Sequence, residues 1–359
     1  MSDVFSGIKH YLLKTNEISI DNNTFKLHYK ATTFVLIACS LLLTQKHYFS
    51  DPIDCYMSSG LVGPDVLDTY CWIADVYTVP SLLHKQIGVE TAHPGIGKST
   101  SNDEKRYHRY YQWVTLFVYL QALLFYVPRF IWKNWEGGKV KMLVAELNTP
   151  IVDEEVKKKR LETLVNYFNI NLHHHKIYAA KYIACEMFNF VNVILQIFFT
   201  DMFLGYEFLK YGREVLNFTG QDIGTRTDPM DRVFPKVTNC YFFHMGKSGT
   251  LEEHTTMCVM PLNILNEKIF IFLWFWYIIV AVLTGMGIIY RLVTLSPFVR
   301  KMLLRARSRL TPSVAVDQVI SKCQYGDWFI LTYLAKNMDP LILRDFMMEL
   351  GKKFKGVDD

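Results

Sequence analysis

Four long apolar stretches interrupt a chain that is otherwise rich in polar and charged residues. The clearest, residues 269–290, contains no charge and is followed directly by Arg291. About 20 apolar residues in a helix cross roughly 30 Å of hydrocarbon, so this stretch predicts a membrane-spanning helix. Within it Ala281 and Gly285 lie four residues apart, and small residues at that spacing permit close contact with another helix.

A second span is predicted over residues 110–130. Its uncharged part begins with two tyrosines and a tryptophan and is followed by Arg129 and Trp132, and such residues suit the two interfaces of a membrane. Pro128 lies near its end. Because proline lacks a backbone N–H, we expect it to end or kink the helix.

A third span is predicted over residues 182–202, although four polar residues interrupt it. Glu186, Asn189, Asn192 and Gln196 fall within an arc of about 120° at 100° per residue, so they form one polar stripe on a helix. The stripe has two interpretations. It forms hydrogen bonds to neighbouring helices of the same subunit, or it contacts another subunit or a water-filled path.

The first span, predicted over residues 29–48, has the shortest apolar stretch. Only residues 31–45 are uncharged, which corresponds to about 22 Å of helix. Either the flanking tyrosines and lysines reach the two interfaces, or one face of the helix lines water. The flanking residues are Tyr29, Lys30, Lys46 and Tyr48.

The positions of basic residues predict how these spans are oriented in the membrane. They cluster after the second and the fourth span, at residues 157–160 and 300–309, and such clusters stay on the cytosolic side of a membrane. We therefore expect both termini in the cytosol and residues 49–109 and 203–268 outside, as two extracellular loops. No secretory signal pattern is evident at the start of the sequence.

Four cysteines lie in the two segments predicted to be outside. Cys55 and Cys71 belong to the first, and Cys240 and Cys258 to the second. Their spacing is not that of a metal knuckle or a redox motif, and disulfides persist in oxidising compartments, so we expect two disulfides. Four cysteines allow three pairings, which spacing does not distinguish.

The remaining segments are predicted to be cytosolic: residues 1–28, 131–181 and 291–359. Apolar residues recur at helical spacing around 161–168 and again around 328–334, which indicates a helical dome. The predicted fold class is therefore an all-α membrane protein, a bundle of four transmembrane helices with disulfide-stapled extracellular loops and a helical cytoplasmic dome.

Composition fits this prediction and excludes other classes. Of 359 residues, 50% are hydrophobic and 20% are charged, which suits a chain that is partly in membrane and partly in water. The net charge of +5 comes without a patch of interleaved arginines and aromatics, so we expect no nucleic-acid partner.

No motif predicts an enzyme, a cofactor or a metal site. Residues 92–99 fit a relaxed phosphate-loop pattern, but His93 and Pro94 lie inside it and polar residues follow. The three histidines at 173–175 cannot all face one ion on a helix, so we expect them to be solvated or interfacial. Glu186 is a single carboxylate without an evident partner base or nucleophile.

One string identifies a family. Residues 110–114 read YYQWV, which resembles the signature that opens the second span of innexins, the invertebrate gap-junction proteins related to pannexins. The residues are Tyr110, Tyr111, Gln112, Trp113 and Val114. Further family-like strings are DPIDC at 51–55, DTYCWI at 68–73, PGIG at 94–97, FYVPR with Pro128 at 125–129, WEGG at 135–138, VFPKVTNC at 233–240, CVMPLNILNEKIFIFLWFW at 258–276 and GDWF at 326–329.

The resemblance implies a subunit of a gap-junction channel. Such subunits form octameric hemichannels in the lipids of the plasma membrane, as homo-oligomers or mixed with other innexins. A hemichannel docks with that of a neighbouring cell at a cell–cell junction and passes ions and small metabolites. The resemblance also implies the disulfides Cys55–Cys258 and Cys71–Cys240, with Cys39, Cys185 and Cys323 free.

Apolar residues near the N-terminus recur with the period of an amphipathic helix. This helix has two possible places. It lies on the membrane surface, or, as the family resemblance implies, it folds into the pore entrance, where Ser2, Asp3, Val4 and Phe5 would narrow the path and Asp3 would influence charge selectivity.

Two other functions stay open. The first is a single-membrane hemichannel that releases small molecules. The sequon Asn217-Phe218-Thr219 would support it if Asn217 is glycosylated, because a bulky glycan near the docking face would hinder docking. The second is a four-span adhesion or scaffold protein without conduction, against which the YYQWV string and the polar stripe argue.

Overall fold

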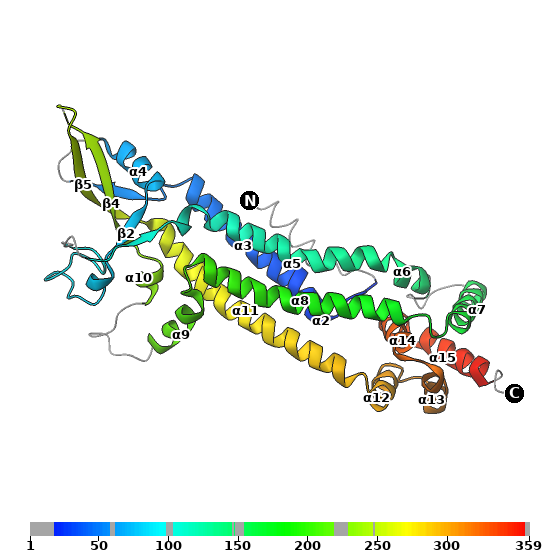
Figure 1. The fold of residues 1–359 in the computed structure, drawn as a ribbon. Coiled ribbons are helices and arrows are strands. Elements are labelled where there is room, and N and C mark those ends of the chain that lie inside the picture. Colours follow the sequence, from blue (N-terminus) through cyan, green and yellow to red (C-terminus); the bar gives the residue numbers. More distant parts are fainter. Residues whose placement is uncertain are drawn as a thin grey trace. The chain divides into compact units, whose positions relative to one another are not determined.

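A computed structural model describes residues 18–57, 62–97, 103–145, 147, 154–218, 229–246 and 248–355 (Figure 1). The chain divides into two compact units. The helical unit comprises the described residues of 1–32, 124–192 and 281–359, and the strand-containing unit comprises those of 33–123 and 193–280. Each of the four long helices contributes one part to each unit.

Four helices among the described residues are long and apolar enough to cross a membrane, as predicted. The first runs over Asn23–Tyr48 and comprises α2 (Asn23–Lys26), a π-helical stretch (Leu27–Thr32) and α3 (Thr33–Tyr48). The others are α5 (Val114–Glu136), α8 (Lys176–Phe203) and α11 (Pro261–Val293).

All four helices have bounds different from those of the predicted spans, and two of the differences are informative. The first begins at Asn23 rather than at Tyr29, because a polar turn whose His28 and Thr32 side chains are buried in protein extends its short apolar stretch. Pro128 lies inside α5, which continues to Glu136, so the proline does not end this helix.

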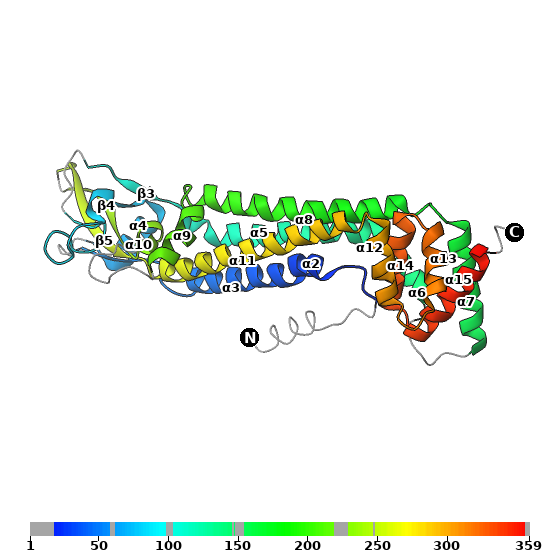
Figure 2. The same ribbon diagram turned by 90° about the horizontal axis from the view of Figure 1, so that it is seen from below.

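The helical unit gathers six shorter helices beside the ends of the long ones (Figure 2). They are α6 (Lys139–Val144), α7 (Glu154–Ile170), α12 (Pro297–Arg307), α13 (Ser313–Lys322), α14 (Tyr325–Asn337) and α15 (Pro340–Lys355). This cluster agrees with the helical fold predicted for these segments.

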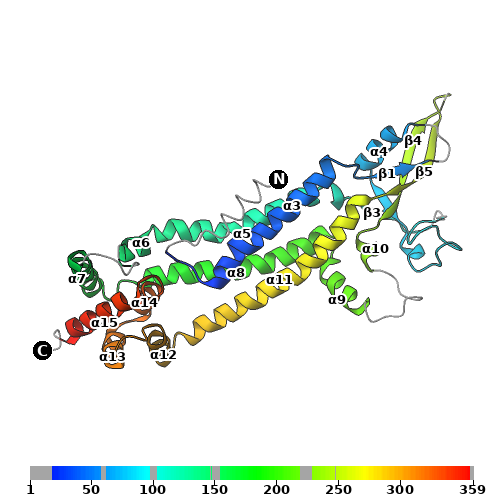
Figure 3. The ribbon, with the colours of Figure 1, turned by 180° about the vertical axis from the view of Figure 1, so that it is seen from behind.

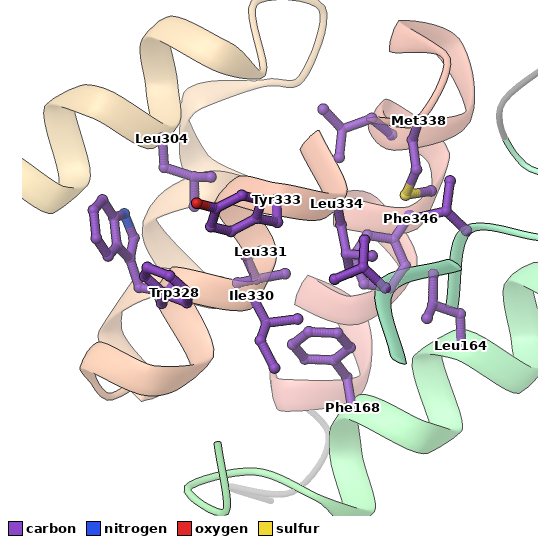
Figure 4. Close-up of a cluster of buried hydrophobic side chains, with 14 of the residues drawn as sticks. Leu164, Phe168, Leu304, Trp328, Ile330, Leu331, Tyr333, Leu334, Met338 and Phe346 are labelled. Carbon is purple, nitrogen blue, oxygen red and sulfur yellow. The ribbon is translucent and has the colours of Figure 1, made fainter. Parts of the chain in front are cut away.

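Helix α14 is the centre of this cluster. It is buried on all sides from Gly326 to Leu334, which is expected of a helix that lies within a core. Figure 4 shows its Ile330 and Leu334 among side chains from α7, α12 and α15, such as Phe168 and Phe346. A capping box between Gln324 and Asp327 satisfies the backbone N–H groups at its start.

The strand-containing unit holds a five-stranded antiparallel sheet that the sequence did not predict (Figure 3). Its order is β1-β5-β4-β2-β3. Strands β1 (Asp54–Tyr56), β2 (Val76–Thr78) and β3 (Arg106–His108) come from residues 49–109, which we call the first cysteine-bearing segment. The hairpin β4 (Val237–Met245) and β5 (Leu251–Val259) comes from residues 203–268, the second cysteine-bearing segment, and lies between them.

Three helices accompany the sheet. They are α4 (Pro64–Ile73), α9 (Phe208–Phe218) and α10 (Pro229–Val233). Helix α4 begins with Pro64 and Asp65 in its first turn, both of which suit a helix N-terminus. Its buried Leu67 and Cys71 belong to one apolar core with Ile53, Val76 and Phe242.

Candidate functional site

Two disulfides join the two cysteine-bearing segments. Cys55 on β1 lies directly opposite Cys258 on β5 in the ladder and is bonded to it, with their Cα atoms 4.0 Å apart. Cys71 on α4 is bonded to Cys240 on β4, with a Cα distance of 5.9 Å. This is the pairing that the family resemblance implied. Both bonds close very long loops and therefore restrict the unfolded chain strongly. Removal of such a disulfide typically lowers the free energy of unfolding by about 2–5 kcal/mol.

The YYQWV residues connect this sheet to the second spanning helix. The Tyr111 hydroxyl donates to the backbone carbonyls of Trp72 and Ala74, at 3.3 and 3.1 Å, and the Gln112 side chain donates to the Trp72 carbonyl at 2.6 Å. These carbonyls lie at the end of α4, next to Cys71. The signature therefore fixes the disulfide-bonded helix against the start of α5.

The other signature residues have distinct surroundings. Tyr110 stacks edge-on against Phe234, and Val114 is buried, whereas Trp113 is 59% exposed. Residues Tyr110–Gln112 form a 3-10 turn, and the regular helix begins at Val114. Pro128 belongs to the part of α5 in the helical unit, so the structure does not bring it together with the others.

His108 is a buried titratable group in the sheet. It lies on β3 and shares a hydrogen bond of 2.9 Å with the Thr78 hydroxyl on β2. Burial, with a smaller contribution from Arg106, lowers the pKa of His108 to about 3. Its imidazole is therefore neutral at physiological pH, and β2 and β3 are joined by an uncharged contact.

A buried ion pair holds the start of the first span in the helical unit. The Arg129 guanidinium lies 2.6 Å from the Asp21 carboxylate, and Tyr29 donates a hydrogen bond of 2.9 Å to the same group. The Lys336 amine donates to the Asp21 backbone carbonyl at 2.9 Å. Residues from α5 and α14 thus fix the segment that precedes the first span.

Glu186 has partners that sequence reasoning missed. Arg291 donates two hydrogen bonds to its carboxylate, at 2.5 and 2.8 Å, and Asn22 donates a third at 2.6 Å. The Arg291 guanidinium also lies over the rings of Tyr182 and Phe329. For Glu186 the interpretation of hydrogen bonding within the subunit is therefore correct.

The next polar residue of the stripe lies beside a small cavity. Both polar atoms of the buried Asn189 amide lack a hydrogen-bond partner among the described residues. The side chain lines a cavity of about 10 Å³ together with Glu186, His28 and Thr284. His28 contacts the Thr284 hydroxyl at 2.8 Å. A cavity of this size is about large enough for one water molecule, which would satisfy part of the amide.

The expectation of solvated or interfacial histidines is wrong for His175. Its Nδ1 lies 2.7 Å from the Asp327 carboxylate, and both side chains are buried. Asp327 also accepts hydrogen bonds from the backbone N–H groups of His173 and Gln324. Burial disfavours the charged form, but the hydrogen bonds outweigh it and hold the pKa of Asp327 below its usual range. The residues form a turn rather than a helix, with His173 at a φ of 69°.

Several predicted positions have simpler outcomes. Cys39, Cys185 and Cys323 are free thiols. Asn217 is exposed near the end of α9. Ser2, Asp3, Val4 and Phe5 lie outside the described residues.

Comparisons with known proteins agree on one family. The family model described as Innexin matches residues 21–354. Innexin inx2 of Schistocerca americana is 51% identical over 358 residues, which cover 99% of each chain. Innexin inx2 of Drosophila melanogaster is also 51% identical, over 99% of this chain and 97% of its own. Innexin shaking-B of Drosophila melanogaster is 41% identical over 98% of this chain and 95% of its own.

The four apolar helices and the disulfide-bonded sheet define a multi-pass membrane protein. The chain belongs to the innexin family, whose members form gap-junction channels and are channel proteins rather than enzymes.

Proposed function

We propose that this chain forms an octameric hemichannel in the plasma membrane, alone or mixed with other innexins. The hemichannel docks with that of a neighbouring cell at a cell–cell junction and passes ions and small metabolites. Both termini lie in the cytosol and the two cysteine-bearing segments lie outside, where disulfides persist.

The disulfide-bonded sheet is the observation that carries this proposal. The hairpin of the second segment lies between strands of the first in one sheet, and each disulfide crosses from one segment to the other. Docking requires less free energy for ordering when the contacting surfaces are already ordered. A sheet tied in this way is a suitable docking surface, and the YYQWV contacts fix it to a spanning helix.

Exposed apolar side chains support oligomer formation in lipid. On the spanning helices Leu41, Val282, Met286 and Ile289 are more than half exposed in the single chain. Such faces contact lipid tails or the helices of neighbouring subunits. At the pore entrance we place Ser2, Asp3, Val4 and Phe5, whose Asp3 would favour cations.

Junctional conductance between paired cells that express the chain tests the proposal. Wild-type pairs should conduct, and Cys71→Ser should abolish the conductance because it removes one disulfide from the sheet. Cys39→Ser is the matched control, since Cys39 is a free thiol. Pairs that carry the protein at their surfaces without a junctional current would contradict docking.

The undocked hemichannel is a second candidate, which the exposure of Asn217 favours. A glycan there would add bulk to the second cysteine-bearing segment. A glycosidase-sensitive mass shift that Asn217→Gln removes, together with dye release from single cells and no transfer between pairs, would select this function. The absence of such a shift would remove its basis.

A further inference from the structure

One face of the β4–β5 hairpin brings two imidazoles and a carboxylate together. His244 lies directly opposite Glu252 in the ladder, and His254 follows two residues after Glu252 on the same strand. Alternate residues of a strand point to the same face. The three side chains therefore share one face, close to the pair Met245–Leu251 at the end of the ladder.

The distances between these groups are too long for charge-assisted hydrogen bonds. Oε2 of Glu252 lies 3.8 Å from Nδ1 of His244 and 3.5 Å from Nε2 of His254. A charge-assisted hydrogen bond is about 2.7–2.9 Å long. The two nitrogens are also covered from solvent and have no hydrogen-bond partner among the described residues. Direct contact between the three groups thus leaves their hydrogen-bonding capacity unused.

We propose that His244, Glu252 and His254 form a binding site for a divalent metal ion of the zinc class. Their ligand atoms lie within 4.8 Å of one another. Tetrahedral zinc with bonds of about 2.0–2.2 Å needs ligand atoms about 3.3–3.5 Å apart. Small rotations of the imidazoles are sufficient to reach that separation, and a neutral imidazole binds through either nitrogen.

The ligand set decides the class of metal. Two imidazole nitrogens and one carboxylate oxygen suit zinc, whereas calcium and magnesium require sites made of oxygen ligands. Three protein ligands leave the fourth position of a tetrahedral ion for water. All three side chains are partly exposed, so an ion can enter from solvent.

Gly246 leaves the space that the carboxylate occupies. A Cβ atom at this position would collide with Oε1 of Glu252. A glycine beside the last pair of the ladder therefore permits the orientation in which Glu252 faces both imidazoles.

The metal would tie the hairpin near its turn. The Cys55–Cys258 disulfide lies toward the opposite end of β5, so the two links would restrain both ends of that strand. Because zinc would bind the folded hairpin and not the unfolded chain, it would raise the stability of the strand-containing unit. Zinc binding here does not depend on channel activity.

Zinc binding to the purified full-length protein tests the site. Competition with a fluorescent chelator gives the affinity, and thermal unfolding with and without zinc gives the stabilisation. His244→Gln, Glu252→Gln and His254→Gln should each weaken binding by at least about tenfold, since loss of even a residue that only hydrogen-bonds to a metal ligand has effects of this size. Each variant should also lose the zinc-dependent rise in unfolding temperature.

Two variants serve as controls. Glu253→Gln changes a carboxylate on the opposite face of the same strand, and His84→Gln removes an exposed histidine elsewhere in the unit. Both should bind zinc as the wild type does. Unfolding temperatures without zinc identify any variant that is misfolded. A wild type that takes up no zinc, or wild-type affinity in any of the three ligand variants, would overturn the site.

Discussion

Arg291 at the end of α11 donates two hydrogen bonds to the buried carboxylate of Glu186 on α8. The two residues are 105 positions apart in the sequence. Asn22, just before the first span, donates to the same carboxylate. Three of the long helices are thus joined at one buried group in the helical unit.

Glu186→Gln should therefore destabilise the helical unit. Loss of one partner leaves Arg291 buried without a counter-charge, which typically costs about 3–5 kcal/mol. The double variant Glu186→Gln/Arg291→Gln should lose less stability than the single variant, because it leaves no unpaired charge buried at this position. Thermal unfolding of the purified protein measures both, and an equal loss in the two variants would contradict the ion pair's role.

Tyr111→Phe should loosen the attachment of α4 to the second span. The hydroxyl donates to two backbone carbonyls, of Trp72 and Ala74. Loss of these hydrogen bonds should lower the free energy of unfolding by about 1–3 kcal/mol. Limited proteolysis of the strand-containing unit should become faster. Tyr107→Phe is the matched control because Tyr107 is 52% exposed on β3. Equal cleavage rates in the two variants would argue against the anchoring role.

The spans could be predicted because they depend on local composition alone. About 20 consecutive apolar residues have few alternatives to a membrane helix, and each predicted span overlaps such a helix for most of its length. The short first stretch shows the limit of that approach. Its helix extends to Asn23 through a turn whose polar side chains, such as His28, are buried by other segments.

The joining of the two cysteine-bearing segments in one sheet could not be predicted because the pairings between them are distant in sequence. Strands β1, β2 and β3 have three residues each, too few for a period of two to be visible. Cys55 is 203 positions from the residue that it pairs with on β5. The sequence did not indicate the cluster of His244, Glu252 and His254 for a different reason: these residues are close in sequence, but the cluster arises only from the register of the hairpin.

Acid should destabilise the strand-containing unit through His108. Its pKa is about 3 when folded, against about 6.5 in the unfolded chain. Between these values only the unfolded chain takes up the proton, so stability decreases as the pH falls below about 6.5. The loss from about pH 7.5 to about pH 5 should be about 2 kcal/mol.

His108→Gln separates this contribution from those of other groups. Between about pH 7.5 and about pH 5 the free energy of unfolding should fall by about 2 kcal/mol less in this variant than in the wild type. This difference does not depend on the stability of the variant at neutral pH. His84→Gln, at an exposed position, should retain the wild-type pH dependence. Unfolding temperatures across the pH series measure both, and an unchanged slope in His108→Gln would be the contrary result.

Gly326→Ala should disrupt the packing of α14 in the helical unit. A Cβ atom at Gly326 would lie 2.5 Å from the backbone carbonyl carbon of His175. Backbone atoms cannot rotate away as a side chain does, so the start of α14 and the His175 turn must separate. Overpacking of this kind usually costs about 1–3 kcal/mol, and separation would also lengthen the His175–Asp327 contact. Gly287→Ala is the matched control, since its nearest neighbour would lie at 3.6 Å and alanine favours a helix. Unfolding temperatures should fall for Gly326→Ala and stay equal or rise for Gly287→Ala; a Gly326→Ala protein as stable as the wild type would show that this approach is not tight.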